Sequence, residues 1–228
     1  MSQAGNSGPR NPTDRVRLVG RALNGTVARA PWLWPVLRAP MRRFFDGSAP
    51  GWDERTNAGS PEHLTALAAG LLHVAPAPER ILDLGTGTGE AALLTAREFP
   101  TASVRGIDFS QQMIAAAKAK VGLDRDGRIA FKVADAADIP WPDDSFDLVV
   151  QLNVPPFFSE IARVLRPLGH VVIAASWGAE TPFYTPDTVL ERGFRRHAIH
   201  ERAAGGAGPG LYWVGRAGDP SLPHAYLD

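Results

Sequence analysis

The segment Ile81–Glu90 constrains the fold of this chain more than any other. A short apolar run ends at Asp83-Leu84, and glycines then occupy every second position of Gly85-Thr86-Gly87-Thr88-Gly89. This pattern predicts a strand that stops, turns tightly and restarts as a helix, with bare backbone against which a ligand can lie. A tight turn without a ligand is the simpler interpretation, but an ordinary turn rarely needs three glycines.

Length and composition indicate one globular domain with a sizeable core. The chain has 228 residues, of which 44% are hydrophobic and 21% charged. The lack of cysteine excludes disulfides, thiolate nucleophiles and cysteine metal sites. Neither a membrane-spanning apolar run nor a secretory signal is apparent, so we expect a cytoplasmic protein. A formal net charge of zero gives no general signature of polyanion binding.

Basic residues are concentrated at the start of the chain. Before residue 46 the acid Asp14 stands alone against eight arginines: Arg10, Arg15, Arg17, Arg21, Arg29, Arg38, Arg42 and Arg43. Such a segment is compatible with a transit peptide, a membrane-surface helix or a nucleic-acid-binding arm. We favour a solvated helical face in an arginine-rich proteome, because lysine is rare here while Ala, Arg, Gly and Pro are abundant.

The first part of the chain is predicted to be an extension of the main domain. Residues 1–12 are rich in Ser, Asn, Gly and Pro and predict a disordered tail. Thr13 can cap a helix with one apolar side that ends near Pro31. We therefore expect an N-terminal helical lid or extension over residues 13–57 and a core over residues 58–228.

Prolines and glycines predict irregular structure within that extension. Three prolines, Pro31, Pro35 and Pro40, are expected to break Trp32–Phe45 into short turns. The stretch Gly47–Gly59 is expected to be a loop. Ser60-Pro61-Glu62 then predicts a helix start, with an N-cap, a proline in the first turn and an acid near the helix N-terminus.

Strands and helices alternate from Arg80 onward. The predicted strands are Ile81–Leu84, Val104–Asp108, Ile129–Val133, Phe146–Leu152 and Val171–Ala175. Helical patterns cover Ala91–Phe99, Gln111–Val121 and Ser159–Leu165. This alternation indicates an α/β fold, with a parallel sheet covered by helices on both faces. After a short helix at Asp187–Gly193, the runs Arg196–Arg202 and Leu211–Arg216 predict an antiparallel hairpin around the glycine-rich loop Gly205–Gly210.

The residues around the glycine turn narrow the class of ligand. The spacing is G-x-G-x-G rather than the G-x-G-x-x-G of dinucleotide sites, and no Walker Lys-Ser/Thr follows. Asp83 before the turn would repel a pyrophosphate but suits a cationic group. Asp108, at the end of the second strand, can accept the hydroxyls of a ribose. Asp135, after the third strand, can accept from an adenine amine at the same edge.

Several ordered blocks resemble the class I S-adenosylmethionine-dependent methyltransferases, in the type 11 small-molecule group that includes ubiquinone/menaquinone C-methyltransferases. The resemblance covers roughly Trp52 to Ser176. Its blocks are Ile81–Glu90, Gly106–Ser110 with Met113, Ala134–Ala136, Phe146–Val150 and Ala162–Gly169. It implies a Rossmann-like seven-stranded sheet with a reversed last strand. It also implies S-adenosylmethionine as cofactor and S-adenosylhomocysteine as product.

The resemblance also assigns roles to the residues that match the family blocks. Asp83, Gly85, Thr86 and Gly87 would line the methionine part of the cofactor. Asp108 would hold the ribose, Phe109 and Met113 would flank the adenine, and Asp135 and Ala136 would recognise its amino edge. Asn153, at the end of the fourth strand, would face both cofactor and substrate.

Two positions depart from the family pattern. The usual loop after the fourth strand, often with paired histidines, is replaced by the short Asn153–Phe158, which is similar to an Asn-Pro-Pro-aromatic motif interrupted by Val154. We interpret that similarity to amino-methylating enzymes as a coincidence. Leu168 stands where a glycine is usual, which should affect only a turn.

Catalytic residues are harder to predict, since the cofactor carries the activation and a general base is needed only for a weakly acidic acceptor. The histidines are His63, His73, His170, His197, His200 and His224. We retain His197 and His200, in the predicted hairpin, and Asp53, on the entrance segment, as weak candidates. Trp177 could wall an aromatic substrate or serve packing alone. No spacing of ligands indicates a metal site.

Three functions remain open from the sequence. The first is methyl transfer to the oxygen, carbon or nitrogen of a small-molecule acceptor. The second is a regulatory or interaction module that binds the cofactor without turnover. The third, ranked last because of the neutral charge, is an RNA methyltransferase that uses the Arg-rich N-terminus. We expect a monomer or homodimer, and the sequence does not name the acceptor.

Overall fold

The computed structural model describes residues 20, 25–27, 30–122 and 126–218. The predicted tail 1–12 and most of the helix predicted to begin at Thr13 lie outside these residues. Gly20 and residues 25–27 are helical, in agreement with that helix.

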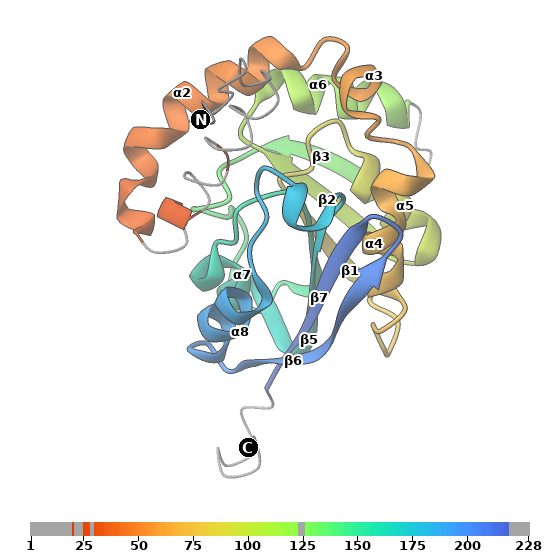
Figure 1. The fold of residues 1–228 in the computed structure, drawn as a ribbon. Helices are drawn as coiled ribbons and strands as arrows, with labels where there is room; N and C mark the ends of the chain where they lie inside the picture. Colours follow the sequence, from red (N-terminus) through yellow and green to blue (C-terminus); the bar gives the residue numbers. More distant parts are fainter. Residues whose placement is uncertain (1–19, 21–24, 28–29, 123–125, 219–228) are drawn as a thin grey trace, which may run out of the picture.

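A seven-stranded sheet in the order β3-β2-β1-β4-β5-β7-β6 organises the chain (Figure 1). Its strands are β1 (Arg80–Leu84), β2 (Ser103–Asp108), β3 (Ile129–Val133), β4 (Phe146–Leu152), β5 (Leu165–Ala175), β6 (Ile199–Ala207) and β7 (Gly210–Ala217). Strands β1 to β5 pair in parallel, while β7 runs antiparallel to both β5 and β6. The Rossmann-like sheet with a C-terminal antiparallel hairpin is thus confirmed.

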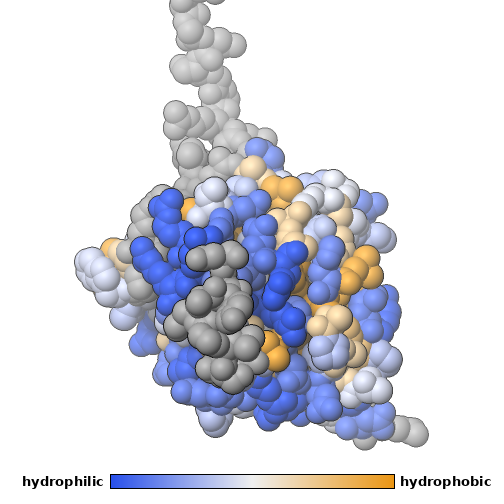
Figure 2. Space-filling view, turned by 90° about the horizontal axis from the view of Figure 1, so that it is seen from below, coloured by the Kyte–Doolittle hydropathy of each residue, from blue (hydrophilic) through white to orange (hydrophobic). Residues whose placement is uncertain are grey.

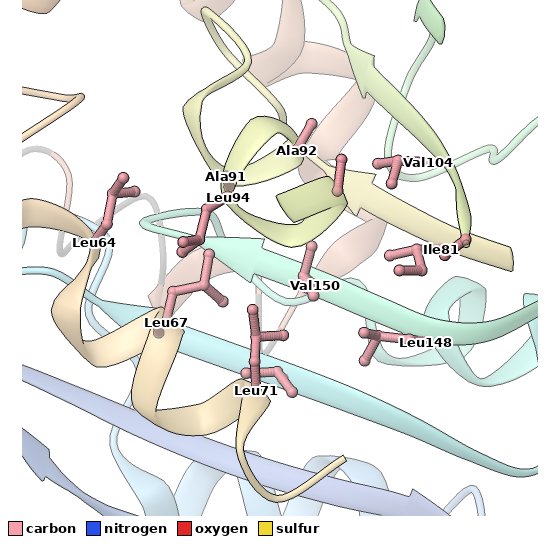
Figure 3. Packing of buried hydrophobic residues seen from close by; sticks show 14 of the residues in the cluster. Leu64, Leu67, Leu71, Ile81, Ala91, Ala92, Leu94, Val104, Leu148 and Val150 are labelled. Carbon is pink, nitrogen blue, oxygen red and sulfur yellow. The ribbon is translucent and has the colours of Figure 1, made fainter. Parts of the chain in front are cut away.

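Helices cover both faces of the sheet, as predicted from the near-continuous apolar strands. One face carries α4 (Pro61–Leu71), α5 (Glu90–Glu98) and α6 (Gln111–Val121), and the other carries α7 (Phe158–Val164) and α8 (Asp187–Arg195). Neighbouring strand residues such as Val149 and Val150 point into opposite clusters. Figure 3 shows α4 and α5 directing leucine and alanine side chains onto β1 and β4.

The predicted capping of α4 is confirmed. The Ser60 hydroxyl accepts a hydrogen bond from the backbone N–H of His63, and Pro61 occupies the first turn, where its missing N–H costs nothing. This cap places His63 in the first turn of α4 with its side chain buried.

The prediction that prolines break Trp32–Phe45 into turns is wrong. After the 3₁₀ turn η1 (Pro31–Leu33), α2 (Trp34–Ser48) runs continuously. Pro35 lies in the first turn, where no intrahelical N–H is needed, and Pro40 lies on the exposed side, where water can satisfy the freed carbonyl of Val36. The predicted loop Gly47–Gly59 likewise contains a short helix, α3 (Trp52–Thr56).

Two further boundaries differ from the prediction. β5 begins at Leu165 rather than Val171, because the strand includes the half-buried Arg166 and the exposed Pro167 and Leu168, which the continuous apolar run of the prediction left out. Gly205 and Gly206, predicted to lie in the hairpin loop, pair with Tyr212 and Leu211 within β6, and the chain turns at Gly208-Pro209. Small residues fit this position because Tyr212 and Leu211 lie close against them.

A third apolar cluster joins the extension to one edge of the sheet. Val27, Trp34, Met41 and Phe157 are buried together, with Phe45, Phe109 and Phe183 packed around them. In Figure 1, α2 arches over the edge at which the parallel strands end. The face seen from below in Figure 2 is mostly hydrophilic, with apolar residues in small groups. No helix among the described residues is long and apolar enough to cross a membrane.

Candidate active site

The glycine turn adopts the backbone that its sequence predicts. Gly85, Gly87 and Gly89 have φ values of 73°, 51° and 92°, a region that side chains disfavour. A Cβ on Gly87 would meet open space, so this backbone is free to face a ligand. A Cβ on Gly85 would lie 2.5 Å from Cγ2 of Val154, so the glycine allows the segment after β4 to approach β1 closely.

Asp83, beneath this turn, is a buried carboxylate with one unused oxygen. Its Oδ2 accepts from the Thr86 hydroxyl at 2.5 Å, while its Oδ1 has no partner among the described residues. Burial raises the pKa of Asp83 to about 7, against the opposing effects of the Thr86 hydroxyl and of the nearby Ala92 N–H, which does not reach Oδ1 as a hydrogen bond. An N–H donor carrying positive charge would satisfy the free oxygen and favour the ionised form.

Asp108 ties the glycine turn to the end of β2. Its Oδ2 accepts from the N–H of Gly87 at 3.0 Å and its Oδ1 from the N–H of Ser110 at 2.8 Å. Burial raises the pKa of Asp108 to about 6. Because each carboxylate oxygen has a second lone pair, Asp108 can hold the turn and still accept from a pair of hydroxyls.

Of the predicted adenine residues, Asp135 and Phe109 both contact Trp34, and Ala136 packs against the same apolar cluster. Both oxygens of Asp135 accept from the indole Nε1 of Trp34, at 2.8 and 2.9 Å, and Oδ1 also accepts from the N–H of Ala137. The Phe109 ring lies 5.8 Å from that indole. The Met113 side chain is buried beneath α6. Sequence reasoning gave no signal for the contact of Trp34, which joins residues 101 positions apart.

Asn153 lies at the end of β4 with a φ of 60°. Its Oδ1 accepts from the backbone N–H of Ser176 at 2.9 Å, and its Nδ2 donates to the Ser176 hydroxyl at 2.9 Å. The same Nδ2 lies 3.4 Å from Nε2 of His63. The side chain of Asn153 therefore links β4, the end of β5 and the first turn of α4.

His63 was one of the six histidines and was not retained as a candidate from the sequence. It is 8% exposed, and its Nδ1 has no partner among the described residues. Burial lowers the pKa of His63 and so favours the neutral ring, against the opposing charges of Glu90 and Asp53. Trp177 packs edge-on against it with ring centroids 6.2 Å apart. The cap at Ser60, three residues earlier, was the only sequence signal for its position.

Two of the three retained catalytic candidates, His197 and His200, are not brought to this site. His200 pairs across the sheet with Arg216, which pairs with His170 in the first half of β5, whereas Asn153 lies beside the end of β5. His197 is exposed in the turn before β6. Both lie far along the hairpin from the carboxyl edge, because β6 begins where the parallel strands begin. His224 lies outside the described residues.

Asp53, the third candidate, is engaged in holding elements together. It accepts from the Thr88 hydroxyl at 2.6 Å and pairs with Lys120 at 2.5 Å, while Lys120 also pairs with Glu90 at 2.6 Å. These contacts clamp α3, the glycine turn and α6 against one another. Within the described ranges, no group of three or more His, Asp or Glu residues could hold a metal ion.

Comparison with known proteins identifies the domain that this geometry forms. Residues 81–169 match the family model described as a methyltransferase domain. Together with the sheet order, this match identifies residues 81–169 as a methyltransferase domain of the class I S-adenosylmethionine-dependent type.

Among curated proteins, the chain resembles ubiquinone/menaquinone C-methyltransferases. It is 37% identical to UbiE of Geotalea daltonii over 162 residues, covering 66% of each chain. It is 32% identical to the malonyl-[acyl-carrier protein] O-methyltransferase of Methylococcus capsulatus, covering 63% of this chain and 55% of that one. The matched part spans 40% to 66% of the length of the first curated relatives.

Solved structures support the fold. A SAM-dependent methyltransferase from Aquifex aeolicus superposes with a TM-score of 0.58 at 18% identity, over 71% of this chain and 95% of that one.

Proposed function

We propose that this chain transfers the methyl group of S-adenosylmethionine to a small-molecule acceptor and releases S-adenosylhomocysteine. The observation that carries the proposal is the buried Asp83, whose free Oδ1 lies beneath a turn of left-handed glycines. A polar atom left unpaired in a protein interior costs about 1–3 kcal/mol, which a cationic ligand would offset.

The residues at the carboxyl edge fit the parts of this cofactor in order. Asp83 and the Gly85–Gly87 backbone would hold the cationic methionine part, Asp108 the ribose, and Asp135 with Phe109 the adenine. When bound, the cofactor supplies a methyl group activated by a sulfonium. The chain then needs only to orient an acceptor in line with that group and keep water out.

We assign the side of the site that faces the acceptor to the cluster of Asn153, Ser176 and His63. Because the Ser176 N–H donates to Oδ1 of Asn153, the other amide atom must be the nitrogen. That nitrogen donates to Nε2 of His63, so a neutral His63 carries its proton on Nδ1. The result is a buried N–H donor without a partner among the described residues, beside Trp177.

We therefore assign His63 the role of a positioning donor for an oxygen of a bound small molecule, either the acceptor or the carboxylate of the cofactor. Val154, packed against Gly85, keeps this cluster close to the glycine turn. The named relatives are a C-methyltransferase of ubiquinone/menaquinone biosynthesis and a malonyl-[acyl-carrier protein] O-methyltransferase, which supports carbon or oxygen as the methylated atom.

The relatives are named as methyltransferases, so a module without turnover is not favoured. Nothing observed on the described residues favours RNA as the substrate. The direct test is incubation with S-adenosylmethionine and a panel of quinols, phenols and carboxylic acids, with S-adenosylhomocysteine as the readout. We expect turnover with at least one acceptor. We also expect saturable binding of S-adenosylhomocysteine when no acceptor is present. A folded protein that binds neither form of the cofactor would refute it.

A further inference from the structure

The carboxylate proposed to recognise adenine already holds a side chain of this protein. The Trp34 Nε1 donates to both oxygens of Asp135, at 2.8 and 2.9 Å, so the N–H bridges the two atoms. Ala137 N–H takes a further lone pair of Oδ1. Little accepting capacity is left on the side of Asp135 that Trp34 faces.

The indole also occupies an aromatic slot. Trp34 is 6% exposed, with its ring 5.8 Å from that of Phe109 and 5.1 Å from that of Phe157. A flat, fused two-ring system with one N–H directed at Asp135 reproduces the shape and the donor of adenine. The slot therefore suits either the indole or the nucleobase, and holds the indole here.

Apart from Trp34, the N-terminal half of α2 is attached through the apolar contacts of Leu37 and Met41 in the third cluster and through a surface ion pair. The helix begins without a side-chain cap, and Val36 and Arg38 are exposed. The ion pair of Arg38 with Asp135 is long, at 3.4 Å, and lies at the surface. By contrast, Asp46 near the other end accepts from the Ser110 hydroxyl at 2.6 Å and anchors the helix to the start of α6.

We propose that Trp34 is an internal competitor for the adenine subsite, so that cofactor binding expels the indole and frees the first half of α2. This inference rests on the proposed function, because it needs Asp135 to be the adenine acceptor. It makes the extension a gate that opens on binding, with α2 pivoting about its Asp46 end.

If Trp34 competes with adenine, its removal should strengthen cofactor binding. If Trp34 instead forms a wall of the adenine subsite, its removal should weaken cofactor binding. Titration of the full-length protein with S-adenosylhomocysteine, followed by calorimetry, should show tighter binding for Trp34→Ala. The expected gain is about tenfold if the open form makes up roughly a tenth of the molecules. Trp34→Phe, which keeps the ring and loses the N–H, should give a smaller gain. Trp32→Ala, at a residue 75% exposed on the same segment, is the matched control and should leave affinity unchanged.

Hydrogen exchange supplies a second readout that does not depend on a variant folding. Backbone amides of residues 32–41 should exchange faster when S-adenosylhomocysteine is added, because the helix start is released. Weaker binding by both Trp34 variants, or slower exchange of these amides, would show that Trp34 forms a wall of the subsite and would overturn the proposal. Loss of all binding in folded Trp34→Ala and wild type alike would instead count against the proposed function.

Discussion

Ser176 and Asn153, at the ends of neighbouring strands, exchange two hydrogen bonds, each of 2.9 Å. This exchange orients the Asn153 amide and so determines which nitrogen of His63 carries the proton. The sheet itself therefore holds the Asn153 amide, which we propose to face the acceptor, because both residues directly follow buried strands.

The assigned donor on His63 can be tested with two isosteric variants. His63→Asn places an amide N–H near the position of Nδ1, whereas His63→Gln places its amide near Nε2. We expect His63→Gln to weaken binding of the acceptor or the cofactor roughly tenfold or more, the cost of one lost buried hydrogen bond, and His63→Asn to retain most of it.

The measurements are the KM of the acceptor and the Kd of S-adenosylhomocysteine, which separate the two possible ligands. Equal loss of kcat in both variants, with both constants unchanged, would indicate a general base instead.

Asp83 predicts a pH dependence of cofactor binding. Burial raises the pKa of Asp83 to about 7, so the folded, cofactor-free protein binds this proton at a higher pH than the unfolded chain does. The contribution of Asp83 to stability is therefore full below about pH 4 and is lost as pH rises through 7. Affinity for the cationic cofactor should accordingly rise between pH 6 and pH 8.

Asp83→Asn should abolish that rise and weaken binding by about 10- to 100-fold at pH 8, while it raises the melting temperature of the cofactor-free protein at that pH. Glu98→Gln, at an exposed position of α5, is the control for a lost carboxylate. An unchanged pH profile in Asp83→Asn would assign the pH dependence to another group.

Leu168, in the first part of β5, carries backbone strain that a single substitution can relieve. This residue has a φ of 63°, a conformation that costs a side-chain-bearing residue about 1–2 kcal/mol, and its side chain is 43% exposed. Leu168→Gly should raise the free energy of unfolding by up to about 1 kcal/mol, after the larger entropy loss of glycine. Urea unfolding of Leu168→Ala, which keeps the Cβ, is the comparison. If the two variants were equally stable, the gain would come from loss of the leucine side chain and not from relief of backbone strain.

The sequence predicts those parts of the site that are local. Asp83 lies near the end of β1, the glycine turn follows β1, and Asp108 ends β2. Apolar runs reveal both strands, and parallel strands end at one edge. His197 and His200 could not be placed, because the start of β6 depends on its register with β7 and not on its own residues. His63 and Trp34 belong to the site only because they contact residues 90 and 101 positions away in the chain, and no local sequence pattern predicts such contacts.

Asp108 offers the most direct test of the central claim that this edge binds S-adenosylmethionine. Calorimetric titration with S-adenosylhomocysteine at pH 8 should show saturable, single-site binding by the wild type. It should be weakened roughly tenfold or more in Asp108→Ala and unchanged in Glu98→Gln. Trp34→Ala should also bind S-adenosylhomocysteine. This variant therefore tests the site even if Trp34 blocks the adenine subsite in the wild type. Absence of binding by both the folded wild type and Trp34→Ala, or equal affinity in Asp108→Ala, would contradict the account.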